Sequence, residues 1–320
     1  MITLIKKCLL VLTMTLLLGV FVPLQPSHAT ENYPNDFKLL QHNVFLLPES
    51  VSYWGQDERA DYMSNADYFK GHDALLLNEL FDNGNSNMLL MNLSTEYPYQ
   101  TPVLGRSMSG WDETRGSYSN FVPEDGGVAI ISKWPIVEKI QHVYANGCGA
   151  DYYANKGFVY AKVQKGDKFY HLISTHAQAE DTGCDQGEGA EIRHSQFQEI
   201  NDFIKNKNIP KDEVVFIGGD FNVMKSDTTE YNSMLSTLNV NAPTEYLGHS
   251  STWDPETNSI TGYNYPDYAP QHLDYIFVEK DHKQPSSWVN ETITPKSPTW
   301  KAIYEYNDYS DHYPVKAYVK

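Results

Sequence analysis

Short hydrophobic runs separated by polar turns recur along this chain, and they predict a mixed α/β fold. Residues 214–217 (VVFI) form a β-branched and aromatic run, which is typical of a strand buried on both faces. Gly218 and Gly219 follow this run, and we expect the chain to turn sharply there because glycine tolerates conformations that other residues avoid. Similar runs predict further strands at residues 37–43, 74–77, 126–132, 158–163, 169–174, 273–278 and 313–319.

Helical patterns lie between several of these strands. Residues 57–69 and 187–207 carry hydrophobic side chains along one helix face, and residues 231–238 form a further candidate helix. Because helices recur between the more numerous strands, the pattern favours an α/β (α+β mixed) fold of two packed sheets with helices outside. No repeat or low-complexity linker interrupts the chain, so we expect a single catalytic domain over residues 30–320.

The first 29 residues have the pattern of a secretory signal peptide. Two lysines precede an apolar stretch at residues 9–22, and Ser27-His28-Ala29 matches a small-residue cleavage site. We therefore expect a secreted, extracellular protein. Only Cys148 and Cys184 remain after cleavage. In an oxidising exterior such a pair favours one disulfide over a catalytic thiol or a zinc site.

Charge narrows the choice of partners. The full chain has a net charge of −17, and removal of Lys6 and Lys7 leaves 22 basic against 41 acidic residues. A protein this acidic repels a phosphate backbone, which argues against a nucleic-acid partner. To hold a phosphate ester, it would need metal ions or a local cationic patch.

Polar residues cluster at the ends of several predicted strands. Asp220 and Asn222 follow the 214–217 run and would point the same way in an extended segment. A strand-to-turn junction could account for either residue alone, since Asp and Asn favour turns. Burial of many polar groups is costly unless they serve each other or a ligand, so together they indicate one shared site. The other clusters are His42-Asn43, Asn78-Glu79, Thr175-His176, Asp274 and Ser310-Asp311-His312.

These clusters occur in motifs that resemble a known family. The motifs HNV, LNE, PEDGGVAIISKWP, STHAQAED, GGDFNV, LDYI and SDHYPV are similar to those of the bacterial secreted sphingomyelinases C, or β-haemolysins. That family belongs to the deoxyribonuclease-like endonuclease/exonuclease/phosphatase superfamily. The resemblance covers residues 36–320 and implies a four-layer sandwich of two mostly antiparallel sheets flanked by helices. GDFN and SDH are shared across the superfamily and specify only metal-assisted phosphoester cleavage.

The resemblance implies roles for the polar strand ends. Glu79 would bind the catalytic divalent cation, Mg²⁺ or alternatively Co²⁺ or Mn²⁺, since Mg²⁺ prefers oxygen ligands. Asn43 would help to place the phosphate. Asp220 and Asn222 would hold the nucleophilic water and a phosphate oxygen.

Two histidines would complete the catalytic machinery. The resemblance makes His312 the general base, oriented by Asp274, because imidazole titrates near neutral pH. His176 would stabilise the charged phosphate and protonate the leaving alkoxide. Asp311 would support the loop or contact the cation through water.

Further matches concern the periphery of the protein. Asn83, Glu124 and Asp125 match a second, peripheral cation site, although a solvated acidic loop is the alternative. Cys148 and Cys184 match the family's disulfide. The membrane-inserting hairpin of the family is shortened here, and Trp300, Ile303 and Tyr304 could contact a bilayer or belong to a packed turn. The aromatic loop 263–268 is a second candidate for either role.

The hypothesis is thus a secreted, Mg²⁺-dependent enzyme that hydrolyses sphingomyelin of the outer leaflet to ceramide and phosphocholine. It would be a monomer with peripheral membrane contact, and a haemolysin or virulence factor. A secreted nuclease or phosphoinositide phosphatase on the same fold is the alternative. A non-catalytic membrane-binding toxin is a third hypothesis.

Overall fold

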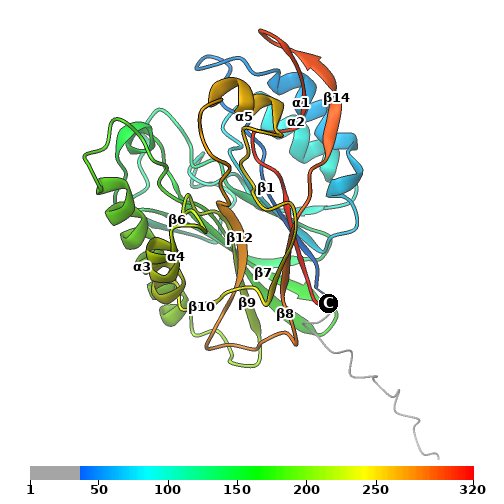
Figure 1. Cartoon of the computed structure of the whole chain (residues 1–320). Coiled ribbons are helices and arrows are strands. Elements are labelled where there is room, and N and C mark those ends of the chain that lie inside the picture. Colours follow the sequence, from blue (N-terminus) through cyan, green and yellow to red (C-terminus); the bar gives the residue numbers. More distant parts are fainter. Residues whose placement is uncertain (1–36) are drawn as a thin grey trace, which may run out of the picture. The chain divides into compact units, whose positions relative to one another are not determined.

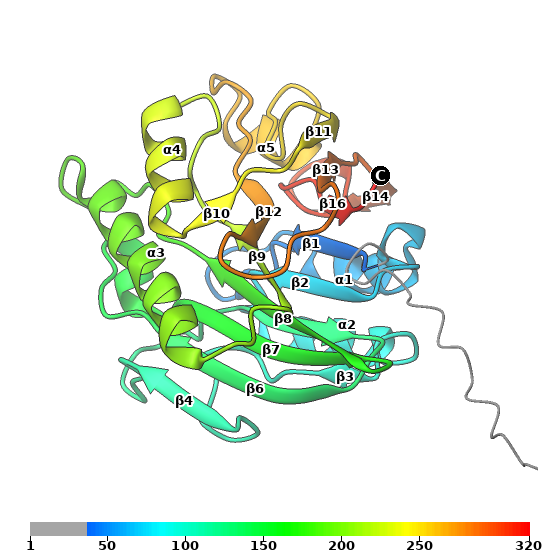
Figure 2. The ribbon, with the colours of Figure 1, turned by 90° about the horizontal axis from the view of Figure 1, so that it is seen from below.

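Two seven-stranded β-sheets lie at the centre of the structure, a computed structural model that describes residues 37–320 (Figures 1 and 2). Four of the six strand pairings in each sheet are antiparallel. The first sheet has the order β11 (Glu245–Gly248), β13 (Val289–Thr292), β16 (Val315–Tyr318), β1 (Leu39–Asn43), β2 (Ala74–Asn78), β5 (Ala129–Ser132), β3 (Tyr99–Gln100). The second has the order β10 (Val240–Asn241), β12 (Asp274–Glu279), β9 (Val214–Asp220), β8 (Lys168–His176), β7 (Gly157–Lys165), β6 (Ile136–Val143), β4 (Glu113–Gly116).

The inner faces of the two sheets share one hydrophobic core. Leu76 of β2 packs in the same buried cluster as Leu172 of β8 and Phe216 of β9. Because side chains alternate along a strand, Leu75 and Leu77 point to the opposite face of the first sheet. A sheet hydrophobic on both faces must be covered on its outer side as well.

Helices cover both outer faces. On the first sheet, Leu75 and Leu77 pack with residues of α1 (Gln56–Asn65) and α2 (Asn83–Leu93). On the second, the side chains of α3 (Glu188–Lys207) and Met234 of α4 (Thr228–Thr237) cover Ile173 and Ile217. The four-layer sandwich of mostly antiparallel sheets is therefore confirmed. Among the described residues no helix is long and apolar enough to cross a membrane.

The predicted strands are all present, but two details were wrong. Residues 218 and 219 do not form a turn, because β9 continues through them to Asp220. A Cβ on Gly219, whose φ is 149°, would lie 1.8 Å from the carbonyl oxygen of Thr175 in β8. Glycine is thus required there for close approach of two strands. The helix predicted at 57–69 ends at Asn65, and a 3₁₀ turn over Asp67–Phe69 completes the segment.

Several elements have no clear hydrophobic pattern and were not predicted. They include β6, which is half polar, α2 and α5 (Ser259–Asn264). The shortened hairpin implied by the resemblance is present as β14 (Lys296–Lys301) and β15 (Glu305–Asp308). The predicted signal peptide lies outside the described residues. Residues 37–320 all belong to one compact unit, whereas the proposed boundary at residue 30 stays a prediction.

Candidate active site

The strand registers bring the polar strand ends together at one edge of the sandwich. Parallel pairing places Asn43 of β1 opposite Asn78 of β2, and His176 of β8 opposite Asp220 of β9. The antiparallel pairing of β9 with β12 then places Asp274 opposite Asp220. Residues that are far apart in sequence therefore meet because they end neighbouring strands.

Hydrogen bonds join the two sheets at this edge. Asn43 Nδ2 donates to Asp220 at 3.0 Å, and Gln41 Nε2 donates to Asp274 at 2.8 Å. Asn78 accepts from the backbone N–H of Asp220 at 3.1 Å. Gln41 and Asn78 had no role assigned from sequence. The side-chain amides of Asn43 and Gln41 fix the two carboxylates by donating to their oxygens, and Asn78 fixes the backbone of Asp220.

His312 and Asp274 form a buried pair. His312 Nδ1 lies 2.8 Å from Asp274 Oδ2, and its Nε2 lies 3.6 Å from Asp220 Oδ2. Burial disfavours the imidazolium, but Asp274 and then Asp220 outweigh that effect and raise the pKa of His312 well above its ordinary value. Asp274 thus holds Nδ1, while Nε2 faces the reacting side of the site.

Glu79 has a carboxylate oxygen without a partner. Its Oε1 accepts from Asn43 Nδ2 at 2.8 Å, whereas its buried Oε2 has no hydrogen-bond partner among the described residues. Burial, followed by repulsion from Asp311, raises the pKa of Glu79 to about 8. The backbone of Glu79 also has a φ of 58°, which is uncommon for a non-glycine residue. Such an arrangement is unfavourable for the protein alone and favourable for a cation ligand.

The donor set around Glu79 fits a divalent cation. Glu79, His176 and Asp220 each offer an atom, and these atoms lie within 4.8 Å of one another. His176 Nε2 is 3.9 Å from Glu79 and 3.7 Å from Asp220. Burial, and next the charge of Lys156, lower the pKa of His176 well below its ordinary value, which disfavours the imidazolium.

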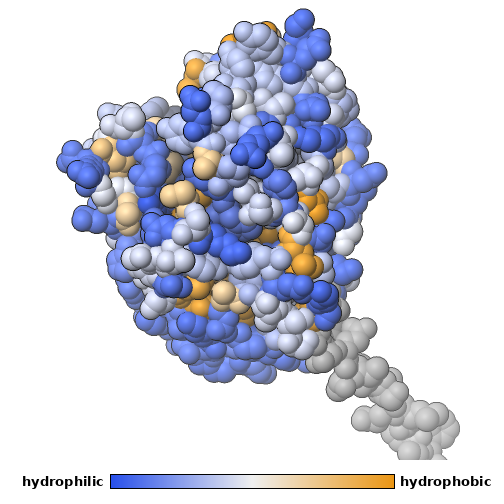
Figure 3. All heavy atoms as spheres, viewed as in Figure 1, coloured by the Kyte–Doolittle hydropathy of each residue, from blue (hydrophilic) through white to orange (hydrophobic). Residues whose placement is uncertain are grey.

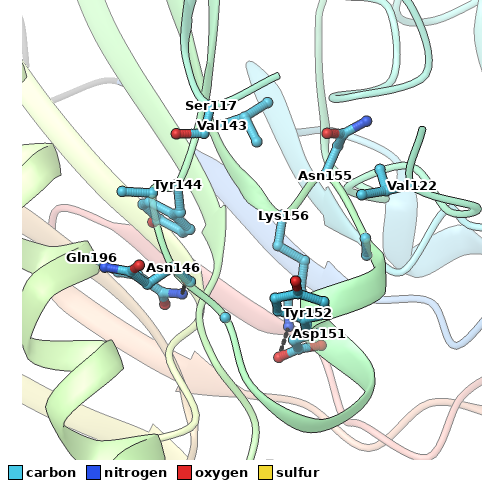
Figure 4. Close-up of a pocket in the computed structure, with 13 residues that line it drawn as sticks. Ser117, Val122, Val143, Tyr144, Asn146, Asp151, Tyr152, Asn155, Lys156 and Gln196 are labelled. Atoms are coloured by element: carbon cyan, nitrogen blue, oxygen red, sulfur yellow. Dashed lines mark hydrogen bonds and ion pairs between the residues drawn. The ribbon is translucent and has the colours of Figure 1, made fainter. Parts of the chain in front are cut away.

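Lys156 supports the site from a neighbouring cavity. Its Nζ lies 2.8 Å from Asp151 Oδ2, a contact shown in Figure 4, and 2.9 Å from the carbonyl oxygen of Ala177. Asn222 Nδ2 donates to the same carbonyl at 3.1 Å. This buried lysine therefore fixes the backbone that follows His176. An isolated Lys has no motif signal, and sequence reasoning missed it.

Asn222 and Asp311 complete the wall near His312. Asn222 is not in an extended segment as expected, because its φ is 52° and its N–H donates to Asp220. It nevertheless lines the same cavity, of about 350 Å³, as Asp311 and His312. Arg59, also missed from sequence, is fully buried and donates to backbone carbonyls of Val44, Phe45, Trp54 and Tyr309.

The residues of the predicted peripheral cation site also lie together. Asn83, Glu124 and Asp125 line one cavity of about 170 Å³. Arg106 occupies part of it and pairs with Asp125 at 2.7 Å. The three residues therefore lie where the expectation puts them, and cation binding there stays a prediction.

For Trp300, the membrane-contact alternative was wrong and the packed-turn alternative is correct. Trp300 is a core residue, because it stacks on Tyr306 and packs with Phe45 and Trp54. It is therefore not available for membrane contact. Ile303 and Tyr304, at the hairpin tip, are exposed.

The disulfide between Cys148 and Cys184 is present, with Cα atoms 5.2 Å apart. Replacing both cysteines with serine is expected to lower the free energy of unfolding by about 3–4 kcal/mol, because the open loop adds entropy to the unfolded chain. Urea unfolding followed by intrinsic fluorescence checks this value. A variant as stable as the wild type would contradict it.

The fold and site define the class of the protein. Residues 40–312 match the Endonuclease/Exonuclease/phosphatase family, and the chain belongs to it. Within that family, the chain belongs with the bacterial sphingomyelinases C. It is 54% identical to a phospholipase C of Staphylococcus aureus, over 98% of this chain and 97% of that protein. It is 53% identical to a sphingomyelinase C of Bacillus cereus, over 91% of each. Its fold matches a mutant beta toxin of S. aureus with bound magnesium ions at a TM-score of 0.87 and 57% identity, covering 89% of this chain and 100% of that one.

Proposed function

We propose that this protein is a secreted, Mg²⁺-dependent sphingomyelin phosphodiesterase, which hydrolyses sphingomyelin to ceramide and phosphocholine. The observation that carries the proposal is the buried His312–Asp274 pair beside the carboxylates of Asp220 and Glu79. This arrangement provides a base and a cation site within one cluster. The family relationship supports sphingomyelin as the substrate.

Glu79 and Asp220 would hold Mg²⁺, because carboxylate oxygens are its preferred ligands and Glu79 Oε2 lacks any other partner among residues 37–320. When bound, the cation supplies positive charge that offsets the carboxylates and the charge developing on the phosphoryl oxygens. Asn43 holds both carboxylates in place through its Nδ2.

His312 then acts as the general base. A cation held by Glu79 and Asp220 would offset the Asp220 charge that helps to raise the pKa of His312, which would leave its Nε2 free of a proton. Nε2 then takes a proton from water as the water oxygen bonds to phosphorus, while Asp274 keeps Nδ1 protonated. Asn222 and Asp220 orient the water and a phosphoryl oxygen. The bond from phosphorus to the ceramide oxygen breaks, and His176, which lies across the cluster, stabilises the leaving oxygen while that oxygen takes a proton from solvent water to become the ceramide hydroxyl.

Membrane contact is the second part of the proposal. Figure 3 shows a face on which hydrophilic residues predominate and hydrophobic residues form only small groups. Contact with the outer leaflet is instead assigned to Ile303 and Tyr304, at the tip of the β14–β15 hairpin beside α1 and α5 (Figure 1). The monomeric state, secretion, haemolysis and the cation site at Asn83, Glu124 and Asp125 remain part of this proposal.

The direct test is release of phosphocholine from sphingomyelin vesicles, compared with phosphatidylcholine vesicles and plasmid DNA. We expect Mg²⁺-dependent release from sphingomyelin, abolished by EDTA and restored by added Mg²⁺, with little activity on the other substrates. Efficient cleavage of DNA with no release of phosphocholine would instead favour a nuclease on the same fold. Release that is unaffected by EDTA would contradict the assigned cation site.

A further inference from the structure

The cavity beside His312 ends in three aromatic rings to which the mechanism assigns no role. Trp253, Tyr265 and Tyr268 line the cavity that Asn222, Asp311 and His312 also line. Their ring centroids are 5.2 Å apart for Trp253 and Tyr265, 6.1 Å for Trp253 and Tyr268, and 5.5 Å for the two tyrosines. Each ring thus contacts both others, and together they form one aromatic wall.

The backbone fixes this wall relative to the catalytic residues. Trp253 forms an antiparallel bridge with His312 itself and another with Gln271. Tyr265 follows α5, whose N-cap Asn258 donates from Nδ2 to the carbonyl of Ser310 at 2.8 Å. The segment that carries the general base is therefore bonded to both elements that carry the aromatic rings.

The wall is only partly covered by protein. Trp253 is 9% exposed, whereas Tyr265 and Tyr268 are 43% and 59% exposed. Packing of a loop would not require two large aromatic rings to remain open to the cavity. The rings leave apolar and π surface beside the reacting groups.

The charge of the cavity suits a cation. Arg193 is buried and pairs with both Glu180 and Glu230, at 2.5 and 2.7 Å. Two carboxylates therefore outnumber one guanidinium, and Asp311 offsets His312, whose pKa is raised, so the same cavity keeps one net negative charge. A positively charged group would enter a negative, aromatic environment.

Aromatic rings around a negative cavity are the usual means of recognising a quaternary ammonium group, since the ring faces attract a cation that cannot donate hydrogen bonds. We propose that Trp253, Tyr265 and Tyr268 form the subsite for the trimethylammonium of the substrate head group. The inference rests on the proposed function and extends it from phosphodiester cleavage to head-group selection. It also replaces the expectation that the aromatic loop 263–268 serves mainly as a membrane contact or a packed turn.

The test compares sphingomyelin with an isostere in which a tert-butyl group replaces the trimethylammonium. Both substrates are presented at equal mole fraction in the same detergent micelles, so that surface binding affects them equally. The wild type is expected to favour the charged substrate in kcat/KM by about 10-fold or more, a ratio set by attraction of the cation to the rings. Tyr265→Leu and Tyr268→Leu, alone and together, are expected to bring this ratio towards one.

Matched variants separate ring recognition from other effects. Tyr265→Phe and Tyr268→Phe keep the ring face and should keep the preference for the charged substrate. Tyr152→Leu removes an exposed tyrosine outside the cavity and should leave the ratio unchanged. Leucine variants that slow both substrates equally would show a membrane or folding role and overturn the subsite.

The same assay distinguishes the two proposals. A wild type that cleaves both substrates with equal kcat/KM would overturn the subsite while the proposed function stands. A wild type that releases no phosphocholine from sphingomyelin would overturn the proposed function and the subsite with it.

Discussion

The His312→Ala variant is expected to lose at least about a hundredfold in kcat for sphingomyelin hydrolysis, because general-base catalysis by a positioned side chain contributes that much or more. The imidazole has its Nδ1 held by Asp274 and its Nε2 directed at Asp220, so no other histidine of the cluster can replace it. KM should change little, since His312 acts on the attacking water. Initial rates of phosphocholine release at saturating Mg²⁺ measure both constants.

A matched control is available on α3. His194 is exposed, its Nδ1 is hydrogen-bonded to Thr237 Oγ1, and it lies outside the catalytic cluster, so His194→Ala should retain wild-type rates. Thermal unfolding of both variants checks that the folds are equivalent. If His312→Ala kept a kcat within a few-fold of the wild type, the general-base assignment would be wrong.

The Glu79→Gln variant is expected to lose about a hundredfold or more in kcat/KM. It removes a charged ligand of the cation, and the cation would stabilise the negative charge that develops on the phosphoryl oxygens in the transition state. The amide keeps the size and the contact with Asn43 but cannot bind a hard cation well. The Mg²⁺ concentration required for half-maximal activity should rise steeply. Titration of activity and of Mg²⁺ binding by calorimetry measures both effects.

Although Glu79→Gln is expected to lower activity, it is expected not to lower the stability of the metal-free protein. Burial raises the pKa of Glu79 from 4.5 to about 8. In the absence of metal, the unfolded chain loses this proton at a lower pH than the folded chain does, so the free energy of unfolding falls as the pH rises from about 4.5 to 8. In EDTA at pH 8, Glu79→Gln should therefore unfold at a temperature equal to or above that of the wild type. A variant that is much less stable in EDTA would mean that Glu79 has a protein partner and is not held for a cation.

The sequence could predict that the site exists because its signals are local. Asn43, Glu79, His176 and Asp220 each follow a hydrophobic run, and strand ends meet wherever the strands pair in register. The motifs then supplied roles that periodicity alone could not. Hydrophobic periodicity could locate the strand ends, but it could not predict which strand ends lie next to each other.

The errors concern features that depend on tertiary contacts. Gly219 looked like a turn residue, whereas its role is to let β9 approach Thr175 of β8. For Trp300 the sequence left a membrane contact and a packed turn open, because the partners that bury it, Trp54 and Tyr306 among them, lie elsewhere in the chain. Gln41 and Lys156 carry no motif, and their importance follows only from the atoms they contact.

The central claim is that a water molecule activated by His312 attacks phosphorus directly, in the cluster of polar residues where the strands end. Hydrolysis of sphingomyelin in H₂¹⁸O, followed by mass spectrometry of both products, tests it most directly. The account predicts one ¹⁸O in phosphocholine, none in ceramide, and no turnover once Mg²⁺ is chelated. Label in the ceramide hydroxyl would place the attack at carbon and contradict the account.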